Sequence, residues 1–370
     1  MIKIEQHQYA PALALFANRR HMMKLAALAE GGVQGEIWAD DALQPRIAVA
    51  RVHNKVLVAS MLPAEAIART WGPWLREMAY DWAMEGDEDV ALLFWDGPES
   101  FDGRRAWELS LPGRHPIYQA QQCYAATPQE VRGASLHQGY ELLAVDAALL
   151  ERGLPHTDQL RQEMCSERAS VEEFLARSFG IAAVREGELA GWCLSEYNCS
   201  EGCEVGIEVL EDHRRQGLAL AMVSAFAQEA ARRGVGRIGW LCNRDNAASA
   251  ATARSAGLRL AREYGRLLCV KEPAVELASG GDALLNAGDA AAAAQRFEQA
   301  LALPGAPPWA GVELAMARVA LGQLDEAFAA LGEVLAKGID YWGWLNHDPR
   351  LQPLRADPRW QRLPRPEGGA

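Results

Sequence analysis

The chain has 370 residues, of which 49% are apolar and 23% are charged, the balance of an ordinary globular protein. This length predicts two or three domains and excludes a largely disordered chain or a miniprotein held together by disulfides. The net charge of −12, from 49 acidic and 37 basic residues, disfavours a general nucleic-acid binder.

The apolar runs are far shorter than the ~18–20 residues of a membrane helix, and the first residues lack the apolar segment of a signal peptide. The seven cysteines are therefore expected to be reduced thiols of a cytoplasmic protein. Cys199 and Cys203 have a spacing found in metal sites, but no second Cys or His pair accompanies them. We therefore predict no metal.

Residues 1–135 are predicted to form an N-terminal domain of mixed α and β structure. Its expected elements are a helix at 10–29, a strand at 36–40, a hairpin at 47–60, a Trp-rich helix around 71–82 and a strand at 90–95. Trp71, Trp74 and Trp82 are interpreted as core residues, because large aromatic side chains dominate packing.

Residues 136–272 are predicted to form a second domain. Two short helices, at 147–152 and 171–177, come first. The expected strands are 180–184, 188–195, 203–209, 238–242 and 258–270, and the longer helices are 217–233 and 246–255. This alternation of strands and helices indicates a mixed α/β sheet.

Residues 273–370 are predicted to be almost entirely helical and contain an internal repeat. Four positions recur 34 residues later with similar side chains: Gly288 as Gly322, Ala293 as Ala327, Phe297 as Leu331 and Ala300 as Val334. The period and the packing pattern resemble the tetratricopeptide (TPR) repeat, with the tail as a cap. An ordinary helical hairpin is the alternative.

The turn after the strand that ends at Val209 carries most of the functional information. At the start of the following helix, backbone N–H groups point outward without partners, and the helix dipole adds partial positive charge. Gly217 lets a phosphate approach closely, and Ala219 keeps the next turn small. Arg214 and Arg215 add positive potential. The pattern therefore predicts a pyrophosphate site.

This pattern, Val209-x4-Arg214-x2-Gly217-x-Ala219, resembles the acetyl-CoA loop of the GNAT N-acetyltransferase superfamily. Asn246 strengthens the resemblance, because it follows a strand, opens a helix and lies eleven residues before a Gly-Leu pair. The superfamily has a similar Asn and a similar Gly-Phe ending.

Further motifs resemble one branch of the superfamily, typified by zwittermicin A resistance proteins. They are Glu204-Val-Gly-Ile-Glu-Val, Trp240-Leu-Cys with Asn246 and Ser249, Arg262-Glu-Tyr264 and Gly35-Glu-Ile-Trp-Ala-Asp-Asp. The resemblance covers about residues 15–270. It implies a GNAT-like mixed sheet at 136–272 and an α+β N-terminal domain, either a degenerate GNAT-like copy or a domain that shapes the substrate site. The all-α, TPR-like segment follows.

The resemblance implies that acetyl-CoA is the cofactor. The pantetheine arm would pair beside the strand end, where the backbone N–H of Val209 would polarise the thioester carbonyl. Asn246 would bond the pantetheine, and Ser249 lies one helical turn further on. The loop that would hold the pyrophosphate comprises Arg214, Arg215, Gln216, Gly217, Leu218 and Ala219.

The amine that attacks the thioester must be neutral, so a general base is expected. Glu204 and Glu208 alternate with apolar residues and therefore share one face of the strand. Glu208, nearest the reacting end, is the first candidate, and Glu204 is the second. The alternative is that either carboxylate only forms a solvated or paired strand face.

Two positions depart from the superfamily pattern. Ala253 stands where many members have a tyrosine that protonates the leaving thiolate, and Leu241 stands where some have a carboxylate. No general acid is therefore identified. Tyr264 and Cys242 are the substitutes, although a thiol with a pKa of about 8.5 can leave without one.

The N-terminal domain contains a second Arg-x-x-Gly sequence, Arg69-Thr-Trp-Gly72. The next residue, Pro73, has no N–H to offer, and Trp74 is bulky where a small residue is needed. No second acetyl-CoA site is expected there.

We expect an N-acetyltransferase that moves the acetyl group of acetyl-CoA to a primary amine of a small, for example antibiotic-like, molecule by direct attack. The alternative is an acyl-CoA-binding sensor or inactive acetyltransferase that acts as an interaction module through its TPR-like segment. The expected partners are the small amine and, through the repeats, another protein or a second copy. Neither nucleic acid nor a membrane is expected.

Overall fold

The computed structural model describes residues 1–16, 23–86, 88–96 and 101–365. The chain groups into two compact units. The first consists of residues 1–72, 92–110 and 118–266, and the second consists of 73–91, 111–117 and 267–370. Two segments of the predicted N-terminal domain thus group with the helical end of the chain.

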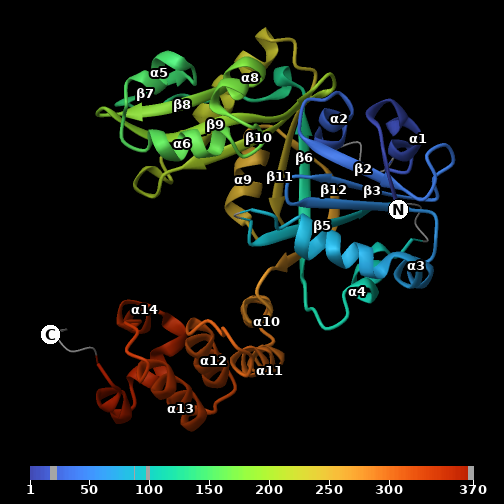
Figure 1. The fold of residues 1–370 in the computed structure, drawn as a ribbon. Coiled ribbons are helices and arrows are strands. Elements are labelled where there is room, and N and C mark those ends of the chain that lie inside the picture. Colours follow the sequence, from blue (N-terminus) through green and yellow to red (C-terminus); the bar gives the residue numbers. More distant parts are fainter. Residues whose placement is uncertain (17–22, 87, 97–100, 366–370) are drawn as a thin grey trace. The chain divides into compact units, whose positions relative to one another are not determined.

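Within the described residues, twelve strands form one mixed sheet in the order β1-β2-β3-β4-β5-β12-β6-β11-β10-β9-β8-β7 (Figure 1). The strands are β1 (Ile2–Ile4), β2 (Gly35–Ala39), β3 (Ile47–Val52), β4 (Lys55–Ser60), β5 (Val90–Asp96), β6 (Ile117–Ala126), β7 (Tyr140–Ala144), β8 (Gly180–Arg185), β9 (Glu188–Cys199), β10 (Gly202–Val209), β11 (Ile238–Asn243) and β12 (Arg259–Val270). The mixed sheet predicted from the sequence is therefore confirmed.

The helices before β12 are α1 (Tyr9–Ala14), α2 (Met23–Ala29), α3 (Ala64–Glu77), α4 (Gly103–Ser110), α5 (Ala147–Glu151), α6 (Thr157–Met164), α7 (Val171–Arg177), α8 (Leu218–Arg232) and α9 (Ala247–Ser255). The single helix predicted at 10–29 is replaced by α1 and α2, and its residues 17–22 lie outside the described part of the chain. Trp71, Trp74 and Trp82, which were interpreted as core, are only partly buried.

The sheet consists of two halves with the same order of elements. In the first half, β4 leads through α3 to a parallel β5, and in the second, β10 leads through α8 to a parallel β11. Parallel neighbours need such a crossover connection. The last strands of the halves are exchanged, because β6 pairs with β11 while β12 lies between β5 and β6. The two halves therefore share one continuous sheet.

Helices cover both faces of the second half. On one face, α8 and α9 bury Leu218, Met222 and Phe226 together with Trp240 of β11. On the opposite face, α5, α6 and α7 pack against β8 and β9. In the first half, α1 and α2 pack against β2 and β3 in a separate core. The strands at the centre of the sheet are thus held from several sides.

The second unit ends in the helices α10 (Pro273–Asn286), α11 (Ala290–Leu301), α12 (Trp309–Ala320), α13 (Leu324–Leu335), α14 (Trp342–His347) and α15 (Gln352–Arg355). The helix boundaries of α12 and α13 reproduce the predicted 34-residue period. Gly288 and Gly322 follow the first helix of each pair with φ values of 88° and 74°. The recurring positions from Ala293 to Val334 are buried, so the repeat corresponds to two helical hairpins.

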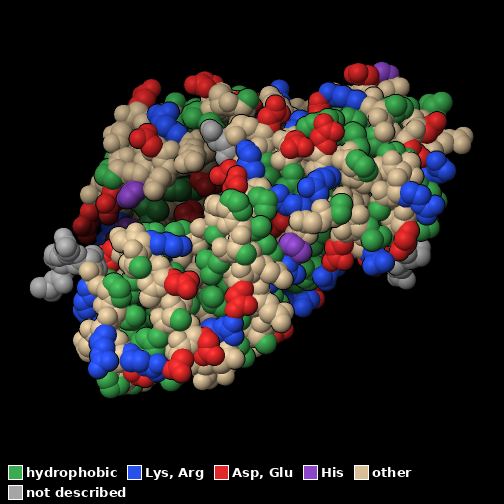
Figure 2. Space-filling view, turned by 60° about the horizontal axis from the view of Figure 1, so that its bottom comes forward, with side chains coloured by type: hydrophobic (Ala, Val, Ile, Leu, Met, Phe, Trp, Pro, Cys, Tyr) green, Lys and Arg blue, Asp and Glu red, His purple; other side chains and the backbone are tan. Residues whose placement is uncertain are grey.

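Two surface properties bear on function. Among the described residues, no helix combines the length and the apolar character that crossing a membrane requires. On the face drawn in Figure 2, basic and acidic side chains are interspersed rather than gathered into a broad basic area.

Candidate functional site: two cavities at a divergent strand pair

β10 and β11 pair at one end and diverge at the other. Their parallel register covers only two residue pairs, although both strands continue beyond it: Cys203 with Ile238 and Glu204 with Gly239. A break of this kind leaves backbone groups of both strands without the partners that a regular sheet would supply.

The backbone of β10 presents its donors to this opening. The N–H of Cys203 donates to the carbonyl oxygen of Arg237 at 3.0 Å, on the side of β11. Hydrogen-bonding direction alternates along a strand, so the N–H groups of Val205, Ile207 and Val209 point to the same side. Beyond the paired end, these N–H groups can meet an extended ligand as a neighbouring strand would.

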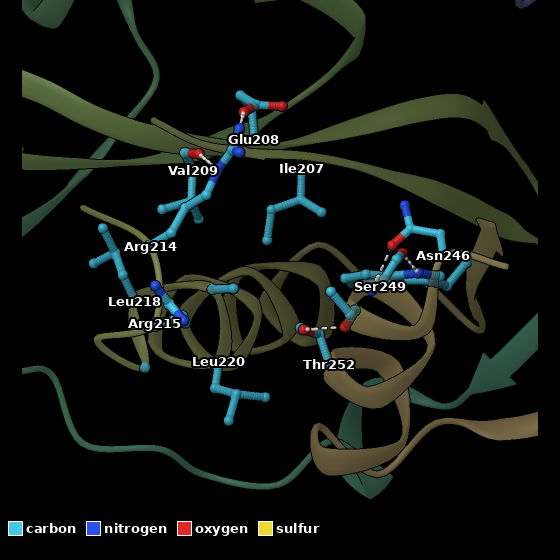
Figure 3. A pocket seen from close by; sticks show the side chains of 14 residues that line it. Ile207, Glu208, Val209, Arg214, Arg215, Leu218, Leu220, Asn246, Ser249 and Thr252 are labelled. Carbon is cyan, nitrogen blue, oxygen red and sulfur yellow. Dashed lines mark hydrogen bonds and ion pairs between the residues drawn. The ribbon is translucent and has the colours of Figure 1, made fainter. Parts of the chain in front are cut away.

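A cavity of about 450 Å³, here called the α8 cavity, lies against the divergent strands and the starts of α8 and α9 (Figure 3). Eight residues predicted to bind the cofactor line it: Val209, Arg214, Arg215, Gly217, Leu218, Ala219, Asn246 and Ser249. Six further lining residues are Ile207, Glu208, Leu220, Trp240, Ala248 and Thr252. The structure thus brings together segments that are 30 residues and more apart in the sequence.

The start of α8 forms one wall of this cavity. Gly217 is the N-cap residue with φ +75°, a conformation that favours glycine. Its carbonyl oxygen accepts from the N–H groups of Leu220 and Ala221 at 3.1 and 3.2 Å. The N–H groups of Leu218 and Ala219 precede these first helical bonds and are left for a ligand. An added Cβ at Gly217 would meet no atom within 4 Å, which leaves open space at this point.

Arg214 is held against β10. Its Nε donates to the Val209 carbonyl oxygen at 2.9 Å, and its Nη2 donates to Glu208 Oε1 at 3.1 Å. In Figure 3, Ile207 points from β10 toward α8, while Glu208 points to the other side of the strand. Glu208 is 45% exposed and paired with Arg214, which places it at the rim of the cavity.

Asn246 and Ser249 form the opposite wall. The Asn246 side-chain oxygen accepts from the Ser249 N–H at 3.0 Å and caps α9. Ser249 Oγ accepts from the Trp240 indole N–H at 3.0 Å. These contacts fix the orientation of the Asn246 amide, and its nitrogen donates no hydrogen bond to the described residues.

Gln216 differs from the other predicted cofactor residues, because its side chain lies outside the cavity. Its Oε1 accepts from the Tyr140 hydroxyl at 3.1 Å. The same hydroxyl lies 2.9 Å from His213 Nδ1. Tyr140 on β7 therefore anchors the loop before α8 from behind, a role that the sequence did not indicate.

A second cavity, of about 290 Å³ and here called the β-face cavity, uses the other face of the same strands. Glu204 of β10 and Leu241 of β11 line it, whereas Ile207 and Trp240 line the α8 cavity. Because side chains alternate along a strand, the two cavities lie on opposite faces of the divergent pair. Lys24, Lys55 and Phe94 bring the first half of the sheet into this wall.

Glu204 is buried and tied to α2. It is 4% exposed, accepts from the Met23 N–H at 2.9 Å and lies 3.7 Å from the buried Nζ of Lys24. Burial raises the pKa of the Glu204 carboxyl and lowers the pKa of the Lys24 ammonium. Glu204 and Glu208, predicted to share one strand face, thus have different surroundings.

Glu196 on β9 is a further carboxyl that the sequence analysis missed. It lies directly opposite Glu204 in the antiparallel register of β9 and β10. A Cβ on Gly206 would collide with its Oε1, so the glycine makes room for this carboxyl. Burial, with the nearby charges of Glu167 and Glu204, raises the pKa of Glu196 to about 8.

Metal binding is not indicated by the described residues. None of their His, Cys, Asp and Glu side chains form a group of three or more that could hold an ion. Cys199 and Cys203 are free thiols. The thiol of Cys199 contacts the carbonyl oxygen of Gly202 at 3.5 Å, within the turn between β9 and β10.

A family model described as GNAT acetyltransferase matches residues 109–267. The chain carries a GNAT acetyltransferase domain. The matched segment contains β9, β10 and β11 and the start of α8, and therefore both walls of the α8 cavity. GNAT acetyltransferases generally use acetyl-CoA, which confirms the coarser part of the sequence prediction.

Solved structures share this fold. A GCN5-related N-acetyltransferase-like protein from Streptococcus suis is 18% identical, with a TM-score of 0.52, covering 71% of this chain and 98% of that chain. A Drosophila protein is 15% identical, with a TM-score of 0.51, covering 73% of this chain and 98% of that chain. At these identities the likeness is one of fold, and it extends beyond the GNAT domain. A search of curated proteins finds no match.

Proposed function

We propose that the chain is an N-acetyltransferase that transfers the acetyl group of acetyl-CoA to a primary amine of a small molecule. The observation that carries the proposal is the opening of β10 and β11 beside a helix start whose first N–H groups face the same cavity. One side of the opening suits an extended thioester, and the other side has a separate cavity for an amine.

The α8 cavity fits acetyl-CoA. The N–H groups of Leu218 and Ala219, with Arg214 and Arg215, would hold the pyrophosphate, because anions bind at helix N-termini. The Asn246 amide would bond the pantetheine, and the aromatic ring of Trp240 supplies an apolar wall. When bound, acetyl-CoA supplies an activated acetyl thioester.

The β10 backbone would then assist the reaction. The N–H of Val209 would donate to the oxygen that becomes negative as the amine attacks, in the manner of an oxyanion hole. The amine would approach from the β-face cavity and lose a proton to a carboxylate. Glu208 and Glu204 were the candidates from the sequence, and Glu196 is a third candidate in the same cavity as Glu204.

The two candidate acids differ in position. Tyr264 lines the β-face cavity, whereas Cys242 is buried in the core beside α8 and burial raises its pKa. Ala253 is fully buried, so nothing else from α9 replaces the missing tyrosine there. We assign no role to Cys242, and we propose that the thiolate leaves unaided or with a proton from Tyr264.

The remaining parts of the chain receive proposed roles as well. The first half of the sheet would shape the amine site through Lys24, Lys55 and Phe94. The two helical hairpins would act as a TPR-like surface for a protein partner or a second copy, since stacked helices of this kind present binding surfaces. The zwittermicin A resistance branch remains our proposal for the type of acceptor.

An acyl-CoA sensor is the second candidate function, favoured by Ala253 in place of a tyrosine. The two are separated by following free thiol from acetyl-CoA with a panel of amines and identifying the N-acetylated product by mass spectrometry. Saturable thiol release with an acetylated amine supports the enzyme. Tight coenzyme A binding without release on any amine supports the sensor.

A further inference from the structure

We propose that the β-face cavity takes an acceptor that carries a carboxylate as well as its amine, an amino-acid-like zwitterion. In this arrangement Arg266 binds the carboxylate, and Glu196 receives the proton from the amine. The inference rests on the proposed acetyltransferase function and names the class of its acceptor.

Two of the charges in the cavity wall already neutralise each other in pairs. Lys24 lies 3.7 Å from Glu204, and Lys55 donates to Glu167 at 3.4 Å. These four side chains come from α2, β10, β4 and the loop before α7. They contribute no net charge to the cavity, so the specificity must come from the other charged groups.

Arg266 on β12 is a cation without an acidic partner. Its Nε donates to Gln119 Oε1 at 2.9 Å, and its Nη2 donates to Asn243 Oδ1 at 3.0 Å, both neutral amide oxygens. No carboxylate of the described residues lies within 4.0 Å of it. Burial lowers its pKa from the usual value. The two amides hold the planar guanidinium in place and leave donors that match a carboxylate.

The acidic side of the cavity also has unused capacity. Neither Glu196 nor Glu163 forms an ion pair with a described residue, and burial raises the pKa of both carboxyls. Glu167 is only 8% exposed, yet its Oε2 has no hydrogen-bond partner among the described residues. A buried polar atom without a partner is unfavourable, and an ammonium group in the cavity would supply the missing donor.

The size and the remaining walls of the cavity suit a molecule of this class. A volume of about 290 Å³ lies near the lower end of the range for ligand sites. The aromatic rings of Phe94 and Tyr264, whose centres are 6.1 Å apart, both line the cavity. They offer an apolar surface between the acidic and basic ends.

The chemical step balances with these residues alone. The amine nitrogen forms a bond to the acetyl carbon, and the carbon–sulfur bond of the thioester breaks. The proton of the amine passes to the Glu196 carboxylate, and the thiolate leaves with the bonding electron pair. The thiolate then takes up a proton from solvent, and Glu196 returns its proton to solvent.

The pH dependence follows from the groups that surround Glu196. The charged and titratable groups around it are Glu163, Glu167, Glu204, Lys24, Lys55, Tyr197, Tyr264 and Arg266. The acidic neighbours and burial outweigh the lysines and raise the pKa of Glu196 to about 8. Only the ionised form accepts a proton, so activity should rise with pH up to this value and then level off.

The test compares matched substrates on the full-length protein. Each pair consists of an amino acid and the amine that lacks its carboxylate, such as phenylalanine with phenethylamine, or 4-aminobutyrate with propylamine. We expect kcat/KM to favour one carboxylate-bearing member by about tenfold or more, the size of a hydrogen bond to a charged group. In Arg266→Gln this ratio should fall toward one. In Arg259→Gln, which changes an 81% exposed arginine, it should stay unchanged.

Binding supplies a second readout. In the presence of coenzyme A, the preferred amino acid should raise the melting temperature of the wild-type chain and of Glu196→Gln but not of Arg266→Gln. Glu196→Gln should also lose the rise of kcat/KM that ends near pH 8. Turnover with no preference in any pair, or a preference that survives Arg266→Gln, overturns the acceptor class. A complete lack of turnover on any amine instead overturns the proposed function itself.

Discussion

The two halves of the sheet contain the same strand–helix–strand unit, but only one of them opens. β4 and β5 pair over five consecutive positions, from Lys55 with Leu92 to Ala59 with Asp96. β10 and β11 pair over two positions and then separate. A paired strand has its backbone donors occupied, so the first half offers no edge to an extended ligand. The family therefore does not require every copy of its unit to bind a cofactor.

The connections before the two helices show the same difference. In the first half, β4 ends at Ser60 and α3 begins at Ala64, which leaves no room for a phosphate-binding loop. Arg69 and Gly72, which repeat the spacing of the cofactor loop, lie inside α3. In the second half, the residues between Val209 and Leu218 form a full loop with a glycine N-cap. The expectation of a single acetyl-CoA site agrees with this geometry.

The largest expected effect comes from closing the open unit to phosphate. Gly217→Glu should weaken binding of coenzyme A by roughly 100-fold or more, since like charges brought together differ by several kcal/mol. Titration calorimetry would measure it. Gly234→Glu is the matched control, because Gly234 has the same φ of 75° and equally open surroundings but lies at the other end of α8. Equal losses in both variants would show that the site lies elsewhere.

Gly206→Ala should separate the two cavities. The added methyl group collides with Glu196 and must displace this carboxyl, so kcat should fall about 100-fold, the lower range for losing a general base. Coenzyme A affinity should remain near that of the wild type. In the Glu196→Gln background, Gly206→Ala should lower kcat little further, because both changes act on one group. Additive losses would contradict the role of Glu196.

Asn246→Ala should affect both stability and affinity. Loss of the α9 cap should lower the free energy of unfolding by about 1 kcal/mol, and loss of the amide donor should weaken coenzyme A binding about fivefold. Asp289→Ala removes an equivalent cap from α11 in the other unit. This control should reproduce the loss of stability in a denaturant titration and leave the affinity unchanged. An affinity loss of equal size in the control would refute a direct contact.

Tyr140→Phe should have the smallest effect. It removes the hydroxyl that joins Gln216 and His213 behind the cofactor loop, so the KM for acetyl-CoA should rise about threefold. The value of kcat should hardly change, because the hydroxyl lies away from the reacting atoms. Steady-state kinetics would show the split. A loss confined to kcat would mean that the loop acts on chemistry rather than on binding.

Local patterns account for what the sequence could predict. The strand at 203–209 and the helix that follows Gly217 appear as β10 and α8 within one or two residues. The GNAT acetyltransferase domain was also predicted, because its loop motif is contiguous. The 34-residue helical period appears as two hairpins. Each of these features depends on residues close together in the chain.

The missed features depend on pairing between distant segments. The exchange of β6 and β12 joins strands more than 100 residues apart, and no local pattern encodes it. Glu196 lies beside Gly206 only through the register of β9 and β10. A carboxyl inside an otherwise apolar strand was the available signal, and it pointed to no role without that register. The roles of Glu204 and Glu208 remain predictions.

The central claim is that one opened strand pair, and not its closed counterpart, binds the cofactor. Titration calorimetry of the full-length chain with coenzyme A measures the number of sites directly. We predict one equivalent bound per chain and none in Gly217→Glu. Two equivalents per chain, or one equivalent that persists in Gly217→Glu, would contradict the account.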